Sequence, residues 1–549
     1  MISKNWKAVV GIAASISLAL TGCSFQQSAA TGDDQMSSDQ VLRIADTGDI
    51  PTLDSAKATD VSSMNILNNI QEGLMRQGQD DQPENGIASD YVVSPDKKTY
   101  TFHLRDDANW SDGKPVTADD FRYAWLRALD PKTASQYAYA LYPIKNAQKY
   151  NQGKASASQV GIKVLDKHTL QVTLERPMLN FISMTTMTVY LPEREDIVEK
   201  YGSKYGTEAD KLVYDGPFTV ESWTPQQVIL QRNDNYWDSN SVSLKTVQIN
   251  IIKDLATGIN MYNAGQIDIV PLNDAFVDAY KQTPDFVSVK QAGVYYILLN
   301  QKNPFFKNDK IRKAITLALD RDQIANRILK DGSSPAGSLV PPSMNGEANK
   351  SFRVGGEVVE TDVGRAQKLF KEGLKELGLS QPPSNIVMVG YDTTARRNVA
   401  VNIKEQLRQT LGWDISLDSP TWKVHLQRAE SGNYDMMMLG WSADYNDPMQ
   451  FFEIFESNNP MNFSHFSNAK YDQLVEKAKQ ETNEHQEYLD LSQAEKILVG
   501  TDGEGQAAFV PLFYGGKSYV QKPYVKEVYR HPFGAEYSLK WAYITKKKQ

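Results

Sequence analysis

Apolar and polar residues alternate along several short segments of this chain. Tyr100, Phe102 and Leu104, for example, are separated by Thr101 and His103. A period of two indicates half-buried strands, because successive side chains of a strand point to opposite faces. The predicted strands are 41–44, 100–104, 170–174, 247–251 and the apolar segment 434–439.

Other segments repeat apolar residues every three or four positions, which is the spacing of one helical face. The longest of them runs from Ile311 to Leu329, with Asp309 as its expected cap. The remaining predicted helices are 119–129, 363–377, 397–411 and 472–498. Because strands and helices alternate irregularly, the pattern predicts a mixed α/β or α+β body.

The beginning of the chain has a different pattern. Two lysines precede a mostly apolar run, 8–20, that is too short for a stable membrane span. The run ends in Leu20-Thr21-Gly22-Cys23, and Cys23 is the only cysteine. We interpret 1–22 as a lipoprotein signal peptide and Cys23 as the lipidated residue. The alternative is an ordinary secretory signal followed by a buried free cysteine.

The next segment, up to residue 40, contains mainly small and polar residues and a single aromatic, Phe25. Such a composition cannot bury enough apolar surface to order itself. We therefore predict a flexible tether over 23–40. Folded structure is expected to begin at Val41.

Composition limits the classes of protein that fit. The length of 549 residues is typical of about two to four domains, and 41% hydrophobic residues suffice for packed cores. A net charge of −8 gives no electrostatic reason to expect nucleic acid. One cysteine allows no intramolecular disulfide. No second apolar stretch approaches the roughly 20 residues of a membrane-spanning helix.

Sequence signals for an enzyme are weak. Gly516-Lys517-Ser518 resembles the end of a phosphate-binding loop, but the first glycine of such a loop would have to stand where Pro511 is. The six histidines never pair at the spacing of a helical metal site. We therefore predict no catalytic residues, no metal and no cofactor, and we do not expect an enzyme.

Two adjacent stretches, Ala88 to Trp110 and Ser111 to Phe121, carry a family signature. The first joins a turn at Ser94-Pro95-Asp96 to a strand and then to a surface loop at 110–113. Further motifs are Gly216-Pro217-Phe218, Asn235-Tyr236-Trp237-Asp238, Ile311-Arg312-Lys313-Ala314, Leu319-Asp320-Arg321 and the segment 440–448. With these motifs the chain resembles the family 5 extracellular solute-binding proteins, and within them the oligopeptide-binding lipoproteins of Gram-positive peptide transporters.

The resemblance implies an α/β architecture, namely the type II periplasmic-binding-protein-like, two-lobed hinge fold with an extra domain. Domain I would comprise 41–71, 197–289 and 514–549, domain II 72–196, and domain III 290–513. Two chain crossings between domains I and III would form the hinge. Closure of the lobes around a ligand would then follow from contacts with both lobes at once.

The same resemblance implies where a peptide would bind. Asp444 matches the aspartate that meets the peptide α-ammonium, although a turn-forming aspartate remains an alternative. Asp447, next to Pro448, is instead expected to cap a helix. The backbone of Met438 to Ser442, which includes Gly440, and of 59–62, which includes Val61, would pair with the peptide backbone.

Aromatic side chains and one arginine complete the implied site. Trp441, Trp422 and Tyr137 match residues that line side-chain pockets in the family, and aromatic walls accept many side chains. Packing in a core is the alternative for each of them. Arg396 is the preferred partner for the peptide carboxylate, ahead of Arg397 and Arg428.

The function implied is a lipid-anchored receptor on the extracellular face of the cell membrane. It would capture oligopeptides and deliver them to the permease subunits of an ATP-driven (ABC) importer, and we expect it to be a monomer. Two alternatives stay open within the binding class. The ligand could be a peptide pheromone, or it could be a tripeptide from murein.

Overall fold

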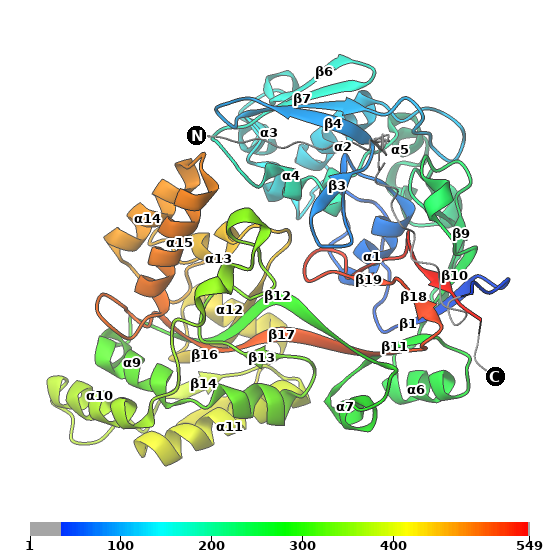
Figure 1. Ribbon diagram of the computed structural model, residues 1–549. Coiled ribbons are helices and arrows are strands. Elements are labelled where there is room, and N and C mark those ends of the chain that lie inside the picture. The colour runs from blue at the N-terminus through cyan, green and yellow to red at the C-terminus, as the bar shows by residue number, and fades with distance from the viewer. Residues whose placement is uncertain (1–34, 547–549) are drawn as a thin grey trace, which may run out of the picture.

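The computed structural model describes residues 35–546. Two lobes face each other across a gap that is bridged by the long strands β12 (Phe286–Leu299) and β17 (Phe509–Gln521) (Figure 1). The predicted α/β class is confirmed. No helix in the described part of the chain is long and apolar enough to cross a membrane. The signal peptide and Cys23 lie outside the described residues.

One eleven-stranded sheet runs through both lobes in the order β15-β14-β16-β12-β17-β11-β1-β10-β9-β8, with β13 attached to β17. Its strands on the domain I side are β1 (Val41–Asp46), β8 (Phe218–Trp223), β9 (Gln227–Arg232), β10 (Thr246–Ile251) and β11 (Ile269–Leu272). Those on the domain III side are β13 (Ser334–Pro335), β14 (Val387–Val389), β15 (Ser416–Asp418) and β16 (Met436–Ser442). The predicted boundaries at 289/290 and 513/514 therefore fall within the two bridging strands.

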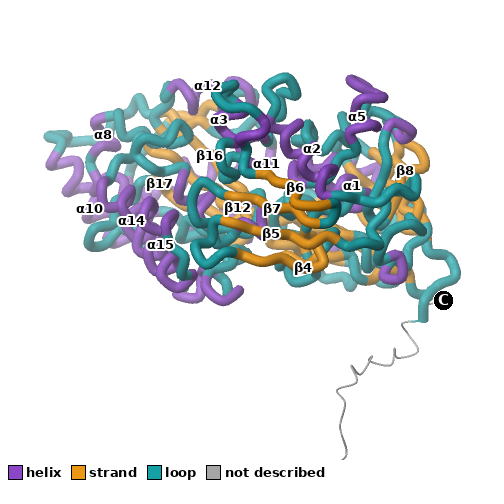
Figure 2. Tube along the Cα trace, turned by 90° about the horizontal axis from the view of Figure 1, so that it is seen from above, coloured by secondary structure: helices purple, strands orange, loops and turns teal. Residues whose placement is uncertain are grey.

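Domain II carries a sheet of its own, in which β4 (Ala88–Val93), β5 (Thr99–Leu104), β7 (Thr169–Thr173) and β6 (Ile162–Asp166) lie side by side (Figure 2). A separate hairpin is formed by β2 (Met75–Gln77) and β3 (Pro83–Asn85). Trp110 and Trp125 are fully buried in the core under this sheet. The expectation of a surface loop at Trp110 is therefore wrong for this side chain, which packs inward.

Helices pack against the sheets in both lobes. In domains I and II they are α1 (Val61–Ile70), α2 (Ala118–Leu129), α3 (Ala147–Asn151), α4 (Phe181–Met184), α5 (Glu195–Tyr201), α6 (Leu255–Asn263) and α7 (Asp274–Tyr280). In domain III they are α8 (Pro304–Lys307), α9 (Asp309–Ala318), α10 (Val363–Glu376), α11 (Thr394–Leu411), α12 (Trp422–Ser431), α13 (Met449–Glu453), α14 (Ala469–Gln480) and α15 (Glu484–Val499). The short C-terminal strands are β18 (Val525–Lys526), β19 (Tyr529–Arg530), β20 (Tyr537–Ser538) and β21 (Tyr543–Ile544).

Two predicted helices are interrupted. The one expected over 311–329 ends at Ala318 and resumes as a π-helical segment at Gln323. The buried guanidinium of Arg321 explains the break, because it donates hydrogen bonds to the carbonyls of Thr316 and Leu319. Asn308, rather than Asp309, caps α9 by accepting from the Ile311 N–H at 3.2 Å.

The helix expected over 472–498 is two helices, α14 and α15. Asn483 separates them, since its side chain accepts from the Gln486 N–H at 3.0 Å and starts α15. The helix expected from Arg397 starts three residues earlier, at Thr394. These differences all concern where helices begin and end, which local capping decides.

The end of the predicted tether is part of the fold. The Ser37 N–H donates to the Ile544 carbonyl at 2.8 Å, and Gln40 is buried with its side chain bonded to the same carbonyl. A flexible tether up to residue 40 is therefore wrong for 37–40, because this segment pairs with the C-terminal strand region.

Domains I and II are joined into one lobe by a buried ion cluster. Arg127 of domain II reaches Asp54 of domain I at 2.7 Å and Glu193 at 2.8 Å. Removing one member of such a cluster leaves a buried charge uncompensated, which costs about 3–5 kcal/mol. The predicted boundary at 196/197 falls inside α5, so the chain does not change domain at a loop there.

The hinge strands have an irregular register. Pairing between β12 and β17 shifts between Lys290 and Val294, which leaves a bulge where the strands pass between the lobes. Gly516 packs so closely against Gly332 that an added Cβ would lie 2.0 Å from the backbone. Gly516-Lys517-Ser518 is thus part of a strand at the hinge, in agreement with its rejection as a phosphate-binding loop.

Candidate functional site

A partly free strand edge marks the domain III side of the gap. β16 pairs with β12 along its whole length, from Met436 to Ser442. On its other side it pairs with β14 only at Met436 and Met437. Within the described residues, no strand occupies this edge from Met438 to Ser442. Backbone groups on such an edge can bind an extended chain whatever its side chains are.

Gly440 and Trp441 lie on this free stretch. The Tyr295 ring lies so close to Gly440 that an added Cβ would be 2.6 Å from it, so this position requires glycine. Trp441 is half-buried and packs against the core of domain III. Its buried indole N–H has no hydrogen-bond partner among the described residues. Trp441 thus has a core contact and an unused donor.

Trp422 is the outermost ring of an aromatic stack. It lies parallel to Tyr391, with ring centroids 5.7 Å apart, and 5.3 Å from His425. Burial lowers the pKa of His425, which favours the neutral ring. Trp422 is 51% exposed, so the alternative that it is a core residue is wrong. Its free face is available to a ligand side chain.

Arg396 lies at the start of α11, stacked on Tyr295 at 4.2 Å and Phe513 at 4.6 Å. Its Nη1 is buried and has no hydrogen-bond partner in the described structure. The two other basic candidates are engaged: Arg397 donates to the Asp392 carbonyl at 2.6 Å, and Arg428 pairs with Asp418 at 2.6 Å. Arg396 is therefore the best placed of the three to receive an anion.

Asp444 follows β16 in a loop whose conformation is held by hydrogen bonds from nearby residues. The Gln450 side chain accepts from the Asp444 N–H at 3.0 Å and donates to the Tyr445 carbonyl at 2.8 Å. Asp447 accepts from the Met449 N–H at 2.8 Å and so has a structural role, but Pro448 holds the N-cap position, and the prediction that Asp447 is the cap is wrong by one residue. Helix α13 begins at Met449, so Pro448 stands just before its first residue.

The Asp444 carboxylate accepts hydrogen bonds from two tyrosine hydroxyls of domain II. Tyr137 donates to Oδ1 at 3.4 Å and Tyr139 to Oδ2 at 3.1 Å. Burial raises the pKa of Asp444, and both hydrogen bonds oppose the rise. No lysine, arginine or histidine of the described chain pairs with Asp444. Asp444 and Tyr137 thus lie together, as the sequence implied, but Tyr139 was missed.

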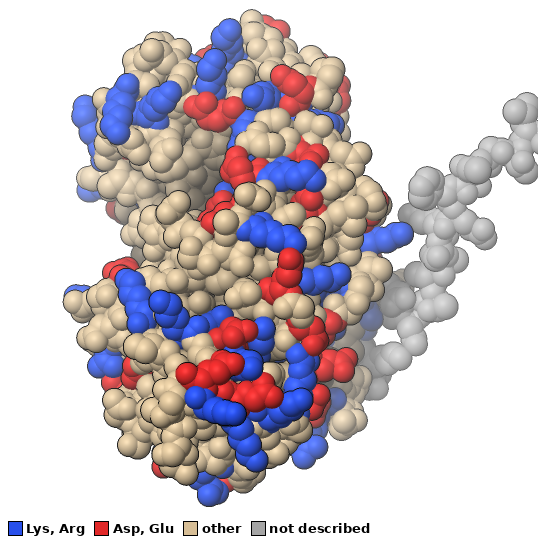
Figure 3. Space-filling view, turned by 90° about the vertical axis from the view of Figure 1, so that its left-hand side faces the viewer, with Lys and Arg blue, Asp and Glu red and all other residues tan. Residues whose placement is uncertain are grey.

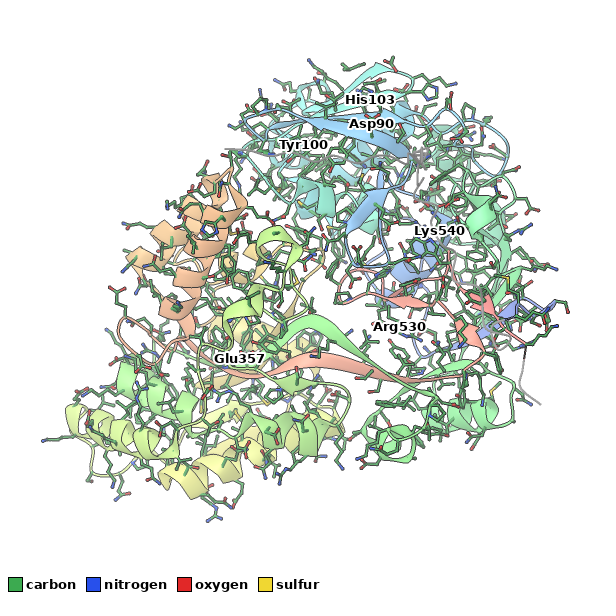
Figure 4. All side chains as sticks on the ribbon, viewed as in Figure 1. Asp90, Tyr100, His103, Glu357, Arg530 and Lys540 are labelled. Carbon is green, nitrogen blue, oxygen red and sulfur yellow. The ribbon has the colours of Figure 1, made fainter. Side chains whose placement is uncertain are left out.

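The domain I side of the gap contains a cavity of about 380 Å³. Val61 lines it and is 42% exposed, so this predicted residue lies at the cavity but apart from Asp444. Charged side chains around the cavity were not predicted: Asp46, Lys517, Arg530 and Glu536. Arg530, which Figure 4 labels, is the last residue of β19. These residues come from distant segments, so no local motif signals them.

Contacts also join domains II and III beside Asp444. Arg176 pairs with Glu453 at 3.3 Å, and the Asn446 N–H donates to Ser183 Oγ at 3.1 Å. A polar cavity of about 400 Å³ lies at this contact and is lined by Glu487. Burial, followed by the charge of Asp447, raises the pKa of Glu487 to about 8. Burial likewise raises the pKa of Asp447 to about 6.

The molecular surface shows a hollow between the lobes on one face, and charges of both signs are interspersed around it (Figure 3). No group of three or more histidine, cysteine or acidic side chains suited to a metal ion occurs in residues 35–546. The arrangement offers a strand edge, aromatic faces, one unpaired carboxylate and one unpaired guanidinium. These are binding groups for a zwitterionic, extended ligand.

Comparison with known proteins identifies the family. The model of the bacterial extracellular solute-binding proteins, family 5 Middle, matches residues 82–463. The chain belongs to this family. It is 32% identical to the dipeptide-binding protein DppE of Bacillus subtilis, covering 98% of this chain and 99% of DppE. As the family consists of substrate-binding proteins, the prediction that the chain is not an enzyme is confirmed.

Solved structures agree with this assignment. The substrate-binding domain of an oligopeptide ABC transporter from Bacillus anthracis has 38% identity and a TM-score of 0.75, covering 93% of this chain and all of that one. The pheromone receptor PrgZ has 30% identity and a TM-score of 0.75, with 92% and 100% covered.

Two structures of the murein tripeptide binding protein MppA bear on the position of the lobes. The unliganded open form has 26% identity and a TM-score of 0.80, covering 94% of this chain and 99% of MppA. The other MppA structure, from Escherichia coli, has 27% identity and a TM-score of 0.74, with 93% and 100% covered. The higher TM-score belongs to the structure described as unliganded and open.

Proposed function

We propose that this chain binds peptides between its lobes and delivers them to the permease of an ABC importer. The observation that carries the proposal is the free edge of β16, from Met438 to Ser442, which leads directly to the half-buried carboxylate of Asp444. An extended peptide placed along this edge would use its backbone for pairing and its α-ammonium for the carboxylate. The names of DppE and of the Bacillus anthracis structure support the same ligand class.

Each end of the peptide has a partner of opposite charge. The ammonium would supply the counter-charge that Asp444 lacks, because a buried unpaired carboxylate is costly. Arg396 would receive the peptide carboxylate through its unpartnered Nη1, close to the start of α11. Trp422 and Trp441 would line the space for side chains without demanding one hydrogen-bond pattern.

Ligand binding would favour the closed arrangement of the lobes. The strand edge, Trp422 and Arg396 belong to domain III, whereas Tyr137 and the Val61 cavity belong to domains II and I. A peptide that touches both sides binds the closed form better and shifts the population toward it. The bridging strands β12 and β17 would bend at their bulge, and the permease would recognise the closed form.

We also propose that the mature protein begins at Cys23 and is anchored by lipid on the extracellular face of the membrane. The Leu20-Thr21-Gly22-Cys23 motif behind a short apolar run supports this proposal. Palmitate labelling of cells that produce the wild-type chain or Cys23→Ala tests it. Label on both chains, or on neither, would contradict lipidation at this cysteine.

Native mass spectrometry of the lipid-free protein, purified without unfolding, tests the peptide proposal. For a nutrient receptor we expect a series of bound masses that match peptides of several lengths. One recurrent mass would favour the second candidates, a peptide pheromone or a murein tripeptide, to which PrgZ and MppA point. A bound sugar, or a metal without peptide, would contradict the proposal.

A further inference from the structure

Tyr139 covers Asp444 from the solvent side. Its side chain belongs to domain II and is 51% exposed, yet its hydroxyl donates to Asp444 Oδ2 at 3.1 Å. Tyr137 lies behind it, stacked on the Tyr139 ring with centroids 5.7 Å apart. Tyr137 and Asp444 line a small cavity of about 30 Å³, whereas Tyr139 does not. Tyr139 is therefore the outer of the two rings over the carboxylate.

The space behind the carboxylate cannot admit a ligand. A cavity of about 30 Å³ holds only one or two water molecules. Its other walls include the polar residues Asn68 and Gln77 beside apolar ones such as Met64, Met187 and Leu191. An ammonium group must therefore approach Asp444 from the side on which Tyr139 lies.

The Tyr139 hydroxyl also satisfies the carboxylate in the absence of a cation. A hydrogen bond to a charged group stabilises more than one between neutral groups, and a buried carboxylate without donors is unfavourable. Burial of the hydroxyl, followed by the charge of Asp444, raises the pKa of Tyr139, so the phenol stays protonated and keeps its donor. In this structure, Tyr139 therefore holds the place that a cationic donor would take.

From this geometry we propose that Tyr139 is a displaceable lid on Asp444, which the α-ammonium of a bound peptide replaces. The inference rests on the proposed function and adds a specificity-determining residue to it. A primary ammonium carries a full charge and three donors, so its interaction with Asp444 more than compensates for the lost phenol hydrogen bond. An N-acetylated terminus has one neutral donor, which does not compensate for that loss. The lid therefore selects peptides whose amino terminus is free.

Tyr139→Phe should bind free-amine peptides more tightly than the wild type. The variant keeps the ring and its stacking but loses the hydroxyl that competes for Oδ2. We expect a gain of roughly 3- to 30-fold, because a hydrogen bond to a charged group is lost from the unliganded state and water replaces only part of it. Partial unfolding cannot produce a gain in affinity, so a folding defect would not imitate this result.

Titration calorimetry at pH 7.5 with alanine peptides of two to six residues, free or N-acetylated, tests the lid. The matched control is Tyr142→Phe, which removes a hydroxyl from the same segment that donates to Asn151 at 2.7 Å and not to Asp444. The control should bind like the wild type. Discrimination against N-acetyl peptides should be smaller in Tyr139→Phe than in the wild type.

The outcomes separate the lid from the peptide proposal. Equal or weaker binding by Tyr139→Phe, with the wild type binding free-amine peptides, would overturn the lid and leave the proposed function intact. Weaker binding would show that the hydroxyl coordinates the ammonium instead. A wild type that binds no alanine peptide and carries no peptide in native mass spectrometry would overturn the proposed function, and the lid with it.

Discussion

The two ends of the proposed peptide site differ in which lobes build them. Asp444 of domain III meets the hydroxyls of Tyr137 and Tyr139 from domain II, so both lobes surround it. Arg396 stacks only on Tyr295 and Phe513, which stand on the two bridging strands β12 and β17. The acidic end is already closed by its own side chains, whereas the basic end lacks a partner from the other lobe.

This difference predicts how the ends divide recognition. The ammonium would bind at Asp444, whose loop is held in place by the two hydrogen bonds of the Gln450 side chain. A fixed and desolvated partner gives strong, stringent binding. The carboxylate meets an arginine held by ring stacking alone, which tolerates displacement. The amino terminus should thus set register, and the carboxyl end should tolerate peptides of different lengths.

The largest expected effect is at the acidic end. Asp444→Ala should lose about 2–5 kcal/mol of binding free energy, roughly 30-fold to several thousand-fold in affinity, because the ammonium would remain buried without a counter-charge. Calorimetry with a free-amine peptide measures it. The control is Asp502→Ala, whose side chain is 84% exposed on the same domain. Unchanged affinity in Asp444→Ala would remove the acidic end from recognition.

Gly440→Ala should disturb the packing of the strand beneath Arg396. The new Cβ would lie 2.6 Å from the Tyr295 ring, on which Arg396 stacks. We expect about 1–3 kcal/mol of destabilisation from overpacking, measured by thermal unfolding. Gly355→Ala is the control, because nothing lies within 4 Å of its added Cβ. An equally small effect in both variants would mean that Tyr295 moves aside freely.

Arg396→Gln tests the basic end directly. Loss of a charge-assisted hydrogen bond at a partly exposed site should weaken peptide binding by about tenfold, or ~1.4 kcal/mol. The adjacent Arg397→Gln serves as the control, since Arg397 bonds its own loop at Asp392. The deficit should vary with peptide length in calorimetry. A deficit as large as that of Asp444→Ala at every length would contradict the proposed difference between the ends.

The last effect concerns stability rather than binding, at the lobe contact beside the acidic end. The pKa of Glu487 is about 8 in the folded chain, above its ordinary value of 4.5. The folded protein therefore binds the extra proton, so the contribution of Glu487 to stability is most favourable below about pH 4.5 and is lost as pH rises toward 8. Glu487→Gln should reduce this fall, seen as thermal midpoints at pH 5 and 8. Glu504→Gln, at an exposed site, should leave it unchanged.

Sequence patterns predicted the elements better than the interactions between them. The alternation at 100–104 and 247–251 gave strands that the structure contains, because half-burial is a local property. The break at Arg321 could not be predicted, since its guanidinium binds the carbonyl of Pro511 nearly 200 residues away. The same limit applies to the 37–40 segment, whose partner is the other end of the chain.

For the candidate site too, residues within one motif could be predicted from the sequence, and residues brought together from distant segments could not. Family motifs placed Asp444, Trp441 and Gly440, which lie in one contiguous segment. Tyr139 was missed although it stands two residues from Tyr137, and the Tyr-Ala-Tyr pattern in a short turn was the available signal. Lys517, Glu536 and Asp46 gave no signal, because three separate segments bring them to one cavity.

The most direct test of the account is calorimetry of the wild-type protein with one peptide in two forms, free at its amino terminus or N-acetylated. The peptide should be one that native mass spectrometry finds bound. We predict that acetylation weakens binding at least about 30-fold, because it removes the counter-charge of Asp444. Equal affinity for the two forms would contradict it.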